Sequence, residues 1–381
     1  MQPLGDAQST LFPKITSKIH MIHTEIRKRP LPLRPGILPV VGTVKLHGTH
    51  ADIVFPDPWT SDDFTLQSRN RVDLTPDRDN QGFAAFALAR KPRILELRTR
   101  ILDRYCELNA SSPGATSQPL IIAGEFIGSG MRQLTGTAVN TLPYQAFVVL
   151  GLNINARWQC DEDYTSICDG FGGEDDRIYH ISRGGFFHER LQLTQPDGGI
   201  RNLMEHMNAV AARCPFAASI GVEGIGEGVV WKPYDDGGDD ADDEDDNHAN
   251  TPQRRAKTYL PPEFWLKTKA EEFWHTQKPS VRPRWKLGVT KETAKEFATE
   301  KVTERRLQQG LEYLHEMGID ASTKRGLGDF INWLAKDVQV EEALEIKEMG
   351  MEPAWVSAEV RTIAKAWYLK RIDTQSNVSG T

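Results

Sequence analysis

The chain has 381 residues and a formal net charge of −7, from 46 lysines and arginines against 53 aspartates and glutamates. Its apolar content of 39% and charged content of 26% are those of a soluble globular protein, and no window holds the roughly 18 uninterrupted apolar residues of a membrane span. Four cysteines without a Cys-x-x-Cys pair do not favour a zinc site, and the N-terminal residues lack the layout of a secretory signal. We therefore expect an intracellular protein, cytoplasmic or nuclear, with two domains and no membrane association.

The acidic charge is concentrated in one segment. Residues 235–246, DDGGDDADDEDD, contain nine acidic groups and no basic one. Removing these nine from the 53 acidic residues leaves 44, against 46 basic residues. The net charge therefore does not exclude a nucleic-acid partner, because a near-neutral body can carry a basic groove. The acidic segment itself has almost nothing apolar to bury, which predicts a disordered loop over residues 235–250.

The first part of the chain has the pattern of an α+β domain. Residues 28–40 are rich in proline and are expected to be extended. Residues 82–105 carry apolar side chains at helical spacing. Short runs rich in Val, Ile and Phe predict strands at 43–46, 51–55, 120–126, 146–154 and 228–232. Because helical and strand patterns do not alternate regularly, we expect mainly antiparallel sheets with flanking helices over residues 1–285.

The pattern changes near residue 290. Leu307, Leu311 and Leu314 recur at i, i+4 and i+7, and Gly318 follows as a natural helix stop. The same spacing returns farther on, and further apolar residues lie between the two stripes: Phe330, Leu334, Val356, Val360, Ile363 and Trp367. We therefore predict a small all-helical domain over residues 290–381.

Residues 40–55 read VVGTVKLHGTHADIVF, two apolar runs separated by a polar turn. Lys45 ends the first run, and Gly48 allows a tight turn beside it. A lysine is a covalent nucleophile only when uncharged, so its pKa of roughly 10.4 must be lowered by burial or by neighbouring cations. The alternative is an ordinary hairpin whose lysine faces water, and these letters alone do not separate the two.

Four more charged residues stand beside or within apolar runs. Glu227 precedes the run that ends at Lys232, and a carboxylate beside glycines at a strand start can reach a metal ion or its water shell. Lys267 and Lys269 are two residues apart, so on a strand both project from one face. Such a pair can hold a phosphate or depress the pKa of a third lysine, whereas the alternative is a solvated strand face.

Further residues have the chemistry of nucleotide binding. Glu125 ends an apolar run before Gly-Ser-Gly and can accept hydrogen bonds from ribose hydroxyls. Phe147 lies within an apolar run, as a core residue by default or as a platform for a purine base. Arg69 can grip a phosphate with its guanidinium, although a surface ion pair is the alternative.

Taken in chain order, these segments resemble the motifs of the covalent nucleotidyltransferase superfamily, which contains polynucleotide ligases and capping enzymes. The matching segments, spread over about residues 40–270, are KLHG at 45–48, GEF at 124–126, Phe147, EGVVWK at 227–232 and KTK at 267–269. Within the superfamily, KLHGT is most similar to the RNA ligase 2 family. About 20 residues separate Lys269 from the helical region, too few for the OB-fold barrel of other members. His50 departs from the family pattern, which has Asn there, and so changes the contacts expected to phosphate or metal-bound water.

The resemblance implies an ATP-dependent RNA ligase that joins a 3′-hydroxyl to a 5′-phosphate through a lysyl-AMP and an RNA-adenylate. Lys45 would be the nucleophile, Lys267 and Lys269 would neutralise the α-phosphate, and Glu227 would hold Mg²⁺, with Mn²⁺ as the alternative ion. The implied catalytic residues are Lys45, Glu227, Lys267 and Lys269. The implied ATP-binding residues are Lys45, Arg69 for a phosphate, Glu125 for the ribose, Phe147 for the adenine, Lys232, Lys267 and Lys269.

The implied partners are RNA ends or a nicked duplex that contains RNA, with separate enzymes for end healing, and we expect a monomer. Two alternatives remain open at this point. One is another enzyme of the superfamily, a DNA ligase or an mRNA guanylyltransferase. The other is a non-catalytic protein that binds RNA ends, which the presence of Lys45, Glu227, Lys267 and Lys269 disfavours.

Overall fold

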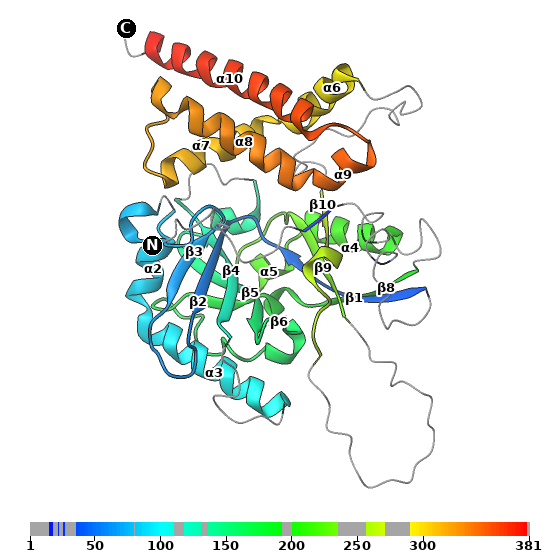
Figure 1. The fold of residues 1–381 in the computed structure, drawn as a ribbon. Helices are drawn as coiled ribbons and strands as arrows, with labels where there is room; N and C mark the ends of the chain where they lie inside the picture. The colour runs from blue at the N-terminus through cyan, green and yellow to red at the C-terminus, as the bar shows by residue number, and fades with distance from the viewer. Residues whose placement is uncertain are drawn as a thin grey trace. The chain divides into compact units, whose positions relative to one another are not determined.

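The computed structural model contains two compact units, Met1–Ala270 and Glu271–Thr381 (Figure 1). The structure describes residues 15–17, 22, 26, 36–79, 81–109, 118–130, 136–192, 200–234, 257–270 and 290–378. The acidic segment at 235–250 and most of the proline-rich segment, 28–35, lie outside the described residues. Among the helices of the described part, none is long and apolar enough to cross a membrane.

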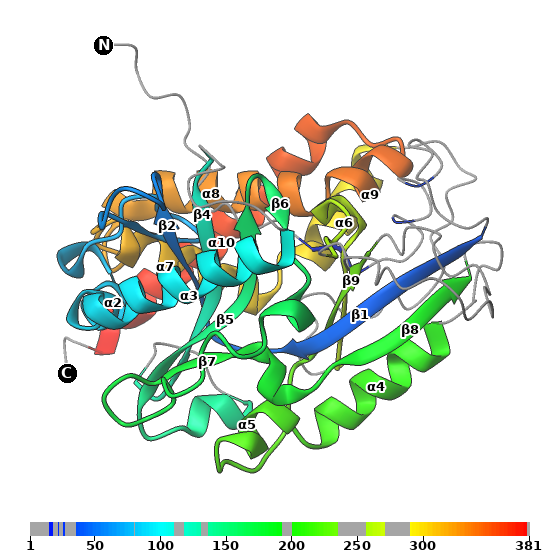
Figure 2. The same ribbon diagram turned by 90° about the horizontal axis from the view of Figure 1, so that it is seen from below.

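The first unit contains a four-stranded antiparallel sheet with the order β10-β9-β1-β8. Its strands are β1 Ile37–Lys45, β8 Phe187–Gln192, β9 Gly228–Pro233 and β10 Leu266–Lys269. Helices α4 Ile200–Ala212 and α5 Pro215–Ser219 belong to the same part of the unit, and Figure 2 shows α4 alongside β8. One face of the sheet, with Val44, Val229 and Trp231, is buried in a core that also contains Leu203 and Phe216 of the two helices.

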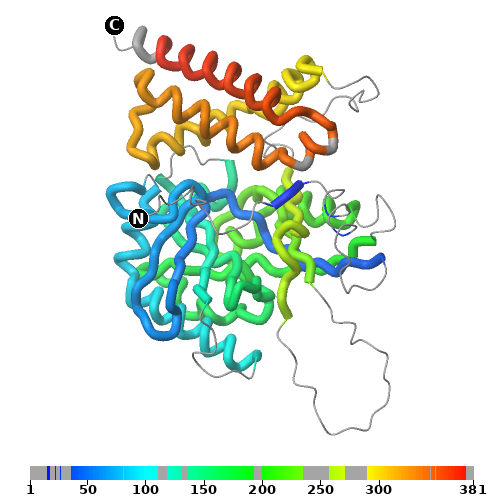
Figure 3. Tube along the Cα trace, in the orientation of Figure 1, coloured from blue at the N-terminus to red at the C-terminus, as the bar shows by residue number. Residues whose placement is uncertain are grey.

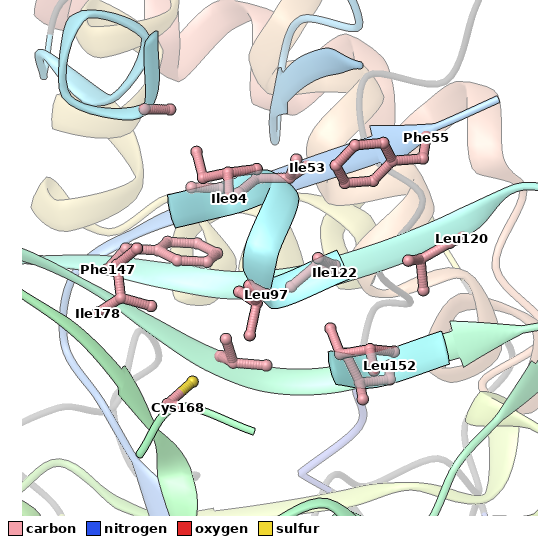
Figure 4. Packing of buried hydrophobic residues seen from close by; sticks show 14 of the residues in the cluster. Ile53, Phe55, Ile94, Leu97, Leu120, Ile122, Phe147, Leu152, Cys168 and Ile178 are labelled. Carbon is pink, nitrogen blue, oxygen red and sulfur yellow. The ribbon is translucent and has the colours of Figure 1, made fainter. Parts of the chain in front are cut away.

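The second sheet of this unit has the order β3-β2-β4-β5-β6, and β7 pairs in parallel with β5. Its strands are β2 Thr49–Phe55, β3 Thr65–Ser68, β4 Leu120–Gly128, β5 Gln145–Ile154, β6 Arg157–Trp158 and β7 Ile178–His180. Helices α2 Phe83–Ala89 and α3 Lys91–Asn109 cover one face. Figure 4 shows Ile94 and Leu97 of α3 packed over Ile53, Ile122 and Leu152 of the strands.

The second unit is helical, as expected from the leucine spacing. Its helices are α6 Lys291–Lys301, α7 Glu304–Glu316, α8 Leu327–Glu341, α9 Ala343–Glu348 and α10 Pro353–Val378. All the stripe residues named above from Leu307 to Trp367 line one core or pack against it, and Gly318 has a φ of 69° just after α7. Figure 3 traces α10 along α8. Short 3₁₀ turns complete the described chain: η1 Pro76–Arg78, η2 Ala138–Thr141, η3 Asp161–Tyr164, η4 Ile181–Gly184, η5 Pro262–Phe264 and η7 Lys324–Gly326.

The α+β fold with mainly antiparallel sheets and a helical C-terminal part is confirmed, and each predicted strand is present. The single helix predicted over 82–105 is instead two helices that meet at Arg90. Pro92 explains the break, because a proline has no N–H and its ring clashes with the carbonyl four residues earlier, at Leu88. Strands β3, β6, β7 and β8 and helices α4 and α5 were not predicted.

Candidate active site

Three neighbouring strands bring Lys45 and Lys269 together. Gly228 on β9 is paired with Lys45 on β1 on one side and with Lys269 on β10 on the other. Alternate residues of a strand share a face, so both lysines project from the face opposite Val229. Gly228 has a φ of 152°, and a Cβ there would lie 2.0 Å from the carbonyl oxygen of Thr268. Only glycine therefore fits between the two lysines.

The carboxylate of Glu227 bridges the two ammonium groups. Its Oε2 lies 2.7 Å from Nζ of Lys45, and its Oε1 lies 2.6 Å from Nζ of Lys269. His47 Nδ1 lies 3.5 Å from the same Oε2. Burial alone would raise the pKa of Glu227, whose side chain is 2% exposed, but Lys269, Lys45 and His47 together hold this pKa well below its usual value. Glu227 is therefore an ionised anchor that orients both lysines.

The environment of Lys269 makes it easy to deprotonate. Burial, together with the charges of Lys45 and Lys267, lowers the pKa of Lys269 to about 7 against the opposing effect of Glu227. Lys267 lies on the same face of β10, as its spacing from Lys269 predicts. The cluster therefore loses a proton near neutral pH, which is the condition that a lysine nucleophile needs.

The turn between β1 and β2 is fixed from the second sheet. The N–H of Gly48 donates to Oε1 of Glu125 at 2.9 Å, and Asn140 Nδ2 donates to the carbonyl of His47 at 2.7 Å. A Cβ at Gly48 would lie 2.3 Å from the carbonyl oxygen of Phe126, so no side chain fits there. Burial raises the pKa of Glu125, while the charge of Lys45 lowers it. The carboxyl group of Glu125 therefore interacts electrostatically with the ammonium group of Lys45.

Arg69 also lies at this site. It directly follows Ser68 of β3, which is paired with Ala51 of β2, next to the His50 that is paired with Glu125 of β4. The structure therefore brings together side chains from five strands or their ends: Lys45, Glu227, Lys269, Glu125 and Arg69.

Phe147 is not in this group, which corrects the expectation that it stacks on adenine. It is paired with Phe126, whereas Glu125 is paired with Val148, so Phe147 and Glu125 point to opposite faces of the sheet. Phe147 is 1% exposed and lies among buried core residues (Figure 4). Its ring lies 5.3 Å from the ring of Phe83, and a Cβ at Gly124 would lie 2.3 Å from it. A base on the Glu125 face cannot reach it.

We predict that Phe147→Leu changes stability and not nucleotide binding. Replacing a core ring by a smaller apolar side chain should lower the free energy of unfolding by about 1 kcal/mol or somewhat more. The KM for ATP in Lys45 adenylylation should stay within about twofold of the wild-type value, because the ring faces the α2 and α3 core. Urea denaturation and adenylylation kinetics measure the two effects. A large rise in this KM with unchanged stability would restore the stacking role.

Lys232 is likewise placed away from nucleotide, contrary to its expected role in ATP binding. Its side chain is 2% exposed, and its Nζ lies 2.6 Å from Oδ2 of Asp161 and donates to the carbonyl of Leu150 at 2.7 Å. The rings of Tyr259 and Trp265 are each 5.1 Å from the same nitrogen. Lys232 therefore joins β9 to β5 and to η3 inside the unit.

The geometry around Glu227 does not fit a metal ion held by the protein. Each carboxylate oxygen already contacts an ammonium group, so a cation would have to displace a lysine. The described residues contain no cluster of three or more His, Cys, Asp or Glu side chains suited to a metal ion. The metal role expected for Glu227 is therefore not supported by this arrangement. A magnesium ion that arrives with ATP takes its ligands from phosphate oxygens and water.

Sequence reasoning assigned no role to three residues that position the lysines and the turn described above. His47 was part of the quoted motif, but its contact with Glu227 depends on pairing between segments 180 residues apart. Asn140 and Asp161 stand alone in their segments and carried no signal at all. Their roles follow only from the tertiary structure.

No protein-family model and no curated protein sequence matches the chain. Among solved structures, it is similar to a variant of Naegleria gruberi RNA ligase with AMP and Mn, at 14% identity and a TM-score of 0.38, over 69% of this chain and 58% of that one. Two further variants with ATP and Mn show 15% identity with a TM-score of 0.39, and 16% identity with a TM-score of 0.34. They match over 70% and 58% of this chain. The chain spans 54% to 58% of the length of these ligases. A likeness of this size does not assign a reaction to this chain. The function must therefore be inferred from the side chains of the site.

Proposed function

We propose that the chain is an ATP-dependent RNA ligase that joins 3′-hydroxyl and 5′-phosphate ends through an adenylate on Lys45. The observation that carries this proposal is the Glu227 carboxylate shared by Lys45 and Lys269 at 2.7 and 2.6 Å. The resemblance of KLHGT to the RNA ligase 2 family supports RNA as the substrate class.

In the first step, the neutral amine of Lys45 attacks the α-phosphorus of ATP. A phosphorus–nitrogen bond forms, the nitrogen releases one proton to water, the bond from this phosphorus to the bridging oxygen breaks, and pyrophosphate leaves with the electron pair. Lys267 and Lys269, on the same side of β10, neutralise the charge that develops on the α-phosphate oxygens. Glu227 holds Lys45 in position, and the second oxygen of Glu125 is the acceptor for a ribose hydroxyl.

In the second step, an oxygen of the RNA 5′-phosphate attacks the adenylate phosphorus. The phosphorus–nitrogen bond breaks, the amine of Lys45 takes up a proton, and the RNA carries AMP in a phosphoanhydride. In the third step, the 3′-hydroxyl attacks the 5′-phosphorus, loses its proton, and expels AMP. We take Mg²⁺, or Mn²⁺ in its place, to enter as part of the nucleotide substrate.

Two measurements test this proposal. Intact mass spectrometry after incubation with ATP or GTP should show a rise of one adenylyl group with ATP only. Sealing should then be found on nicked duplexes with RNA at the junction. A guanylyl adduct would identify a capping enzyme, and sealing of all-DNA nicks alone would identify a DNA ligase. The absence of any adduct would favour the non-catalytic protein that binds RNA ends.

Adenylylation should depend on pH through the Lys45–Lys269 pair. Below the pKa of about 7 for Lys269 the pair holds an extra proton, so the single-turnover rate should rise about tenfold per pH unit and level off above this value, where Lys269 can hold the remaining proton while Lys45 attacks. In Lys269→Arg the guanidinium keeps its proton, so the inflection should move upward by at least about one unit. Rapid-quench measurement of the adduct gives both profiles.

Lys91→Arg, the same substitution at an exposed helix position, is the control and should keep the wild-type profile. An inflection that stays near pH 7 in Lys269→Arg would show that another group supplies the proton acceptor.

A further inference from the structure

The outer edge of β10 is in contact with the N-terminal part of the chain. β10 stands at the end of the order β10-β9-β1-β8, so among the described strands only β9 pairs with it. On the other edge, Thr16 forms a parallel bridge with Leu266. The backbone N–H of Lys267 donates to the carbonyl of Thr16 at 2.8 Å. A residue from before β1 therefore covers the edge of the strand that carries the lysine pair.

Apolar side chains before and after Thr16 anchor this contact. Ile15 packs against a buried cluster that contains Trp265, the residue directly before β10. Ile22 is 0% exposed and lies in the same core as Leu266. Burial of apolar side chains is the main favourable contribution to holding a segment against a sheet. The residues around Thr16 are thus packed onto the first unit at β10.

The strand that they cover needs such support. β10 contains only the four residues Leu266–Lys269, and short segments with few packed neighbours are the parts of a fold that open most readily. The proposed reaction nevertheless requires Lys267 and Lys269 at fixed places, because a charge stabilises a transition state best when it is already in position. The hydrogen bond to Thr16 constrains the backbone of Lys267 directly.

The place of Lys267 has a measurable effect on its neighbour. Burial lowers the pKa of Lys269, and three charged groups act on the same ammonium: Glu227 just before β9, Lys45 at the end of β1, and Lys267 on β10. Glu227 raises this pKa, whereas Lys45 and Lys267 lower it. If Lys267 moves away, the pKa of Lys269 must rise. The pH dependence of adenylylation therefore reports where Lys267 lies.

We propose that residues 15–17 form a positioning segment of the active site, which fixes Lys267 by closing the outer edge of β10. This inference rests on the proposed function for the reaction that Lys267 serves. The contact itself requires no reaction and can be tested without one. Thr16 acts through its backbone carbonyl, so the anchoring side chain of Ile15 is the one to substitute.

Hydrogen–deuterium exchange of the full chain, read by mass spectrometry, tests the contact. In Ile15→Asp a carboxylate would have to be buried beside Trp265, which is costly, so the positioning segment should detach. Peptides that cover β10 should then exchange at least about tenfold faster than in wild type. Peptides that cover β4 should be unchanged, which shows that the unit is folded. Unchanged exchange of β10 in Ile15→Asp would overturn the inference.

Adenylylation kinetics test the positioning role. At pH 7 and saturating ATP, Ile15→Asp should form the Lys45 adduct about ten- to a hundredfold more slowly, because the charge of Lys267 is no longer held at the α-phosphate. The inflection of the pH profile should also move upward from about 7, since Lys269 loses the effect of one cation. A loss of stability alone reduces the amount of folded protein and leaves this inflection in place.

Ser17→Asp is the matched control, because Ser17 is exposed and the substitution adds the same charge to the same segment. It should keep the wild-type exchange, rate and inflection, and an equal loss in this variant would overturn the inference. Ile15→Val keeps the apolar anchor and should behave as wild type. If Ile15→Asp does not fold, Ile15→Ala should show the same changes to a smaller degree.

The inference is also wrong if a variant with faster exchange of β10 keeps the wild-type inflection and a rate within about twofold of wild type. A missing adduct in the wild-type protein would instead refute the proposed ligase function. The exchange measurement would still decide whether residues 15–17 hold β10.

Discussion

Replacing Lys45 by alanine should abolish the adenylate adduct. The wild-type mass should rise by one adenylyl group with ATP, and the Lys45→Ala mass should not rise at all. The choice of Lys45 over Lys269 follows from exposure, because the Lys45 side chain is 21% exposed beside the Gly48 turn, whereas that of Lys269 is 8% exposed. The partially exposed amine can reach a bound nucleotide, and the buried one can only support it.

Lys269→Ala provides the matched comparison, since it removes the other amine from the same carboxylate. It should still form the adduct, about a hundred- to a thousandfold more slowly, because one charge that stabilises the transition state is lost. Peptide mapping of the wild-type adduct should place AMP on Lys45. An undiminished adduct in Lys45→Ala, mapped to Lys269, would reverse the two roles.

The sequence predicts the side chains of this site better than their arrangement. The face shared by Lys267 and Lys269 follows from the period of two along a strand, and it could be read directly. That Gly228 lies between Lys45 and Lys269 depends on the register of three strands drawn from distant parts of the chain. Local patterns do not encode that register, so the contacts of Glu227 could not be predicted.

Lys232, one of the two misplaced residues, is held by a feature of β5 that the sequence does not reveal. The pairing of β4 with β5 shifts between Ala123 and Gly124, so that Leu150 is passed over. A shift of one residue exchanges the faces of a strand, and a bulge leaves no mark in a continuous apolar run. The same bulge presents the carbonyl of Leu150 to Nζ of Lys232 at 2.7 Å, which helps to hold this lysine inside.

Asp161→Ala should destabilise the first unit severely. The substitution would leave the ammonium of Lys232 buried without its carboxylate, and breaking such a pair from one side costs about 3–5 kcal/mol. That loss is a large part of the roughly 5–15 kcal/mol by which domains are usually stable. Urea denaturation, followed by tryptophan fluorescence, should show a much lower midpoint. A loss below about 1 kcal/mol would mean that water or another group compensates the charge.

The double variant Asp161→Leu with Lys232→Met separates this structural role from nucleotide binding. Replacing both members of a buried pair by apolar side chains is often neutral, so most of the lost stability should return. The neighbouring rings of Tyr259 and Trp265 already provide apolar surroundings, although the hydroxyl of Tyr259 loses its contact with Asp161 at 3.2 Å. Because Lys232 lies inside the unit, the folded double variant should form the Lys45 adduct with a KM for ATP close to that of wild type. A stable double variant with a KM raised tenfold or more would show that Lys232 reaches the nucleotide after all, as the resemblance of EGVVWK implied.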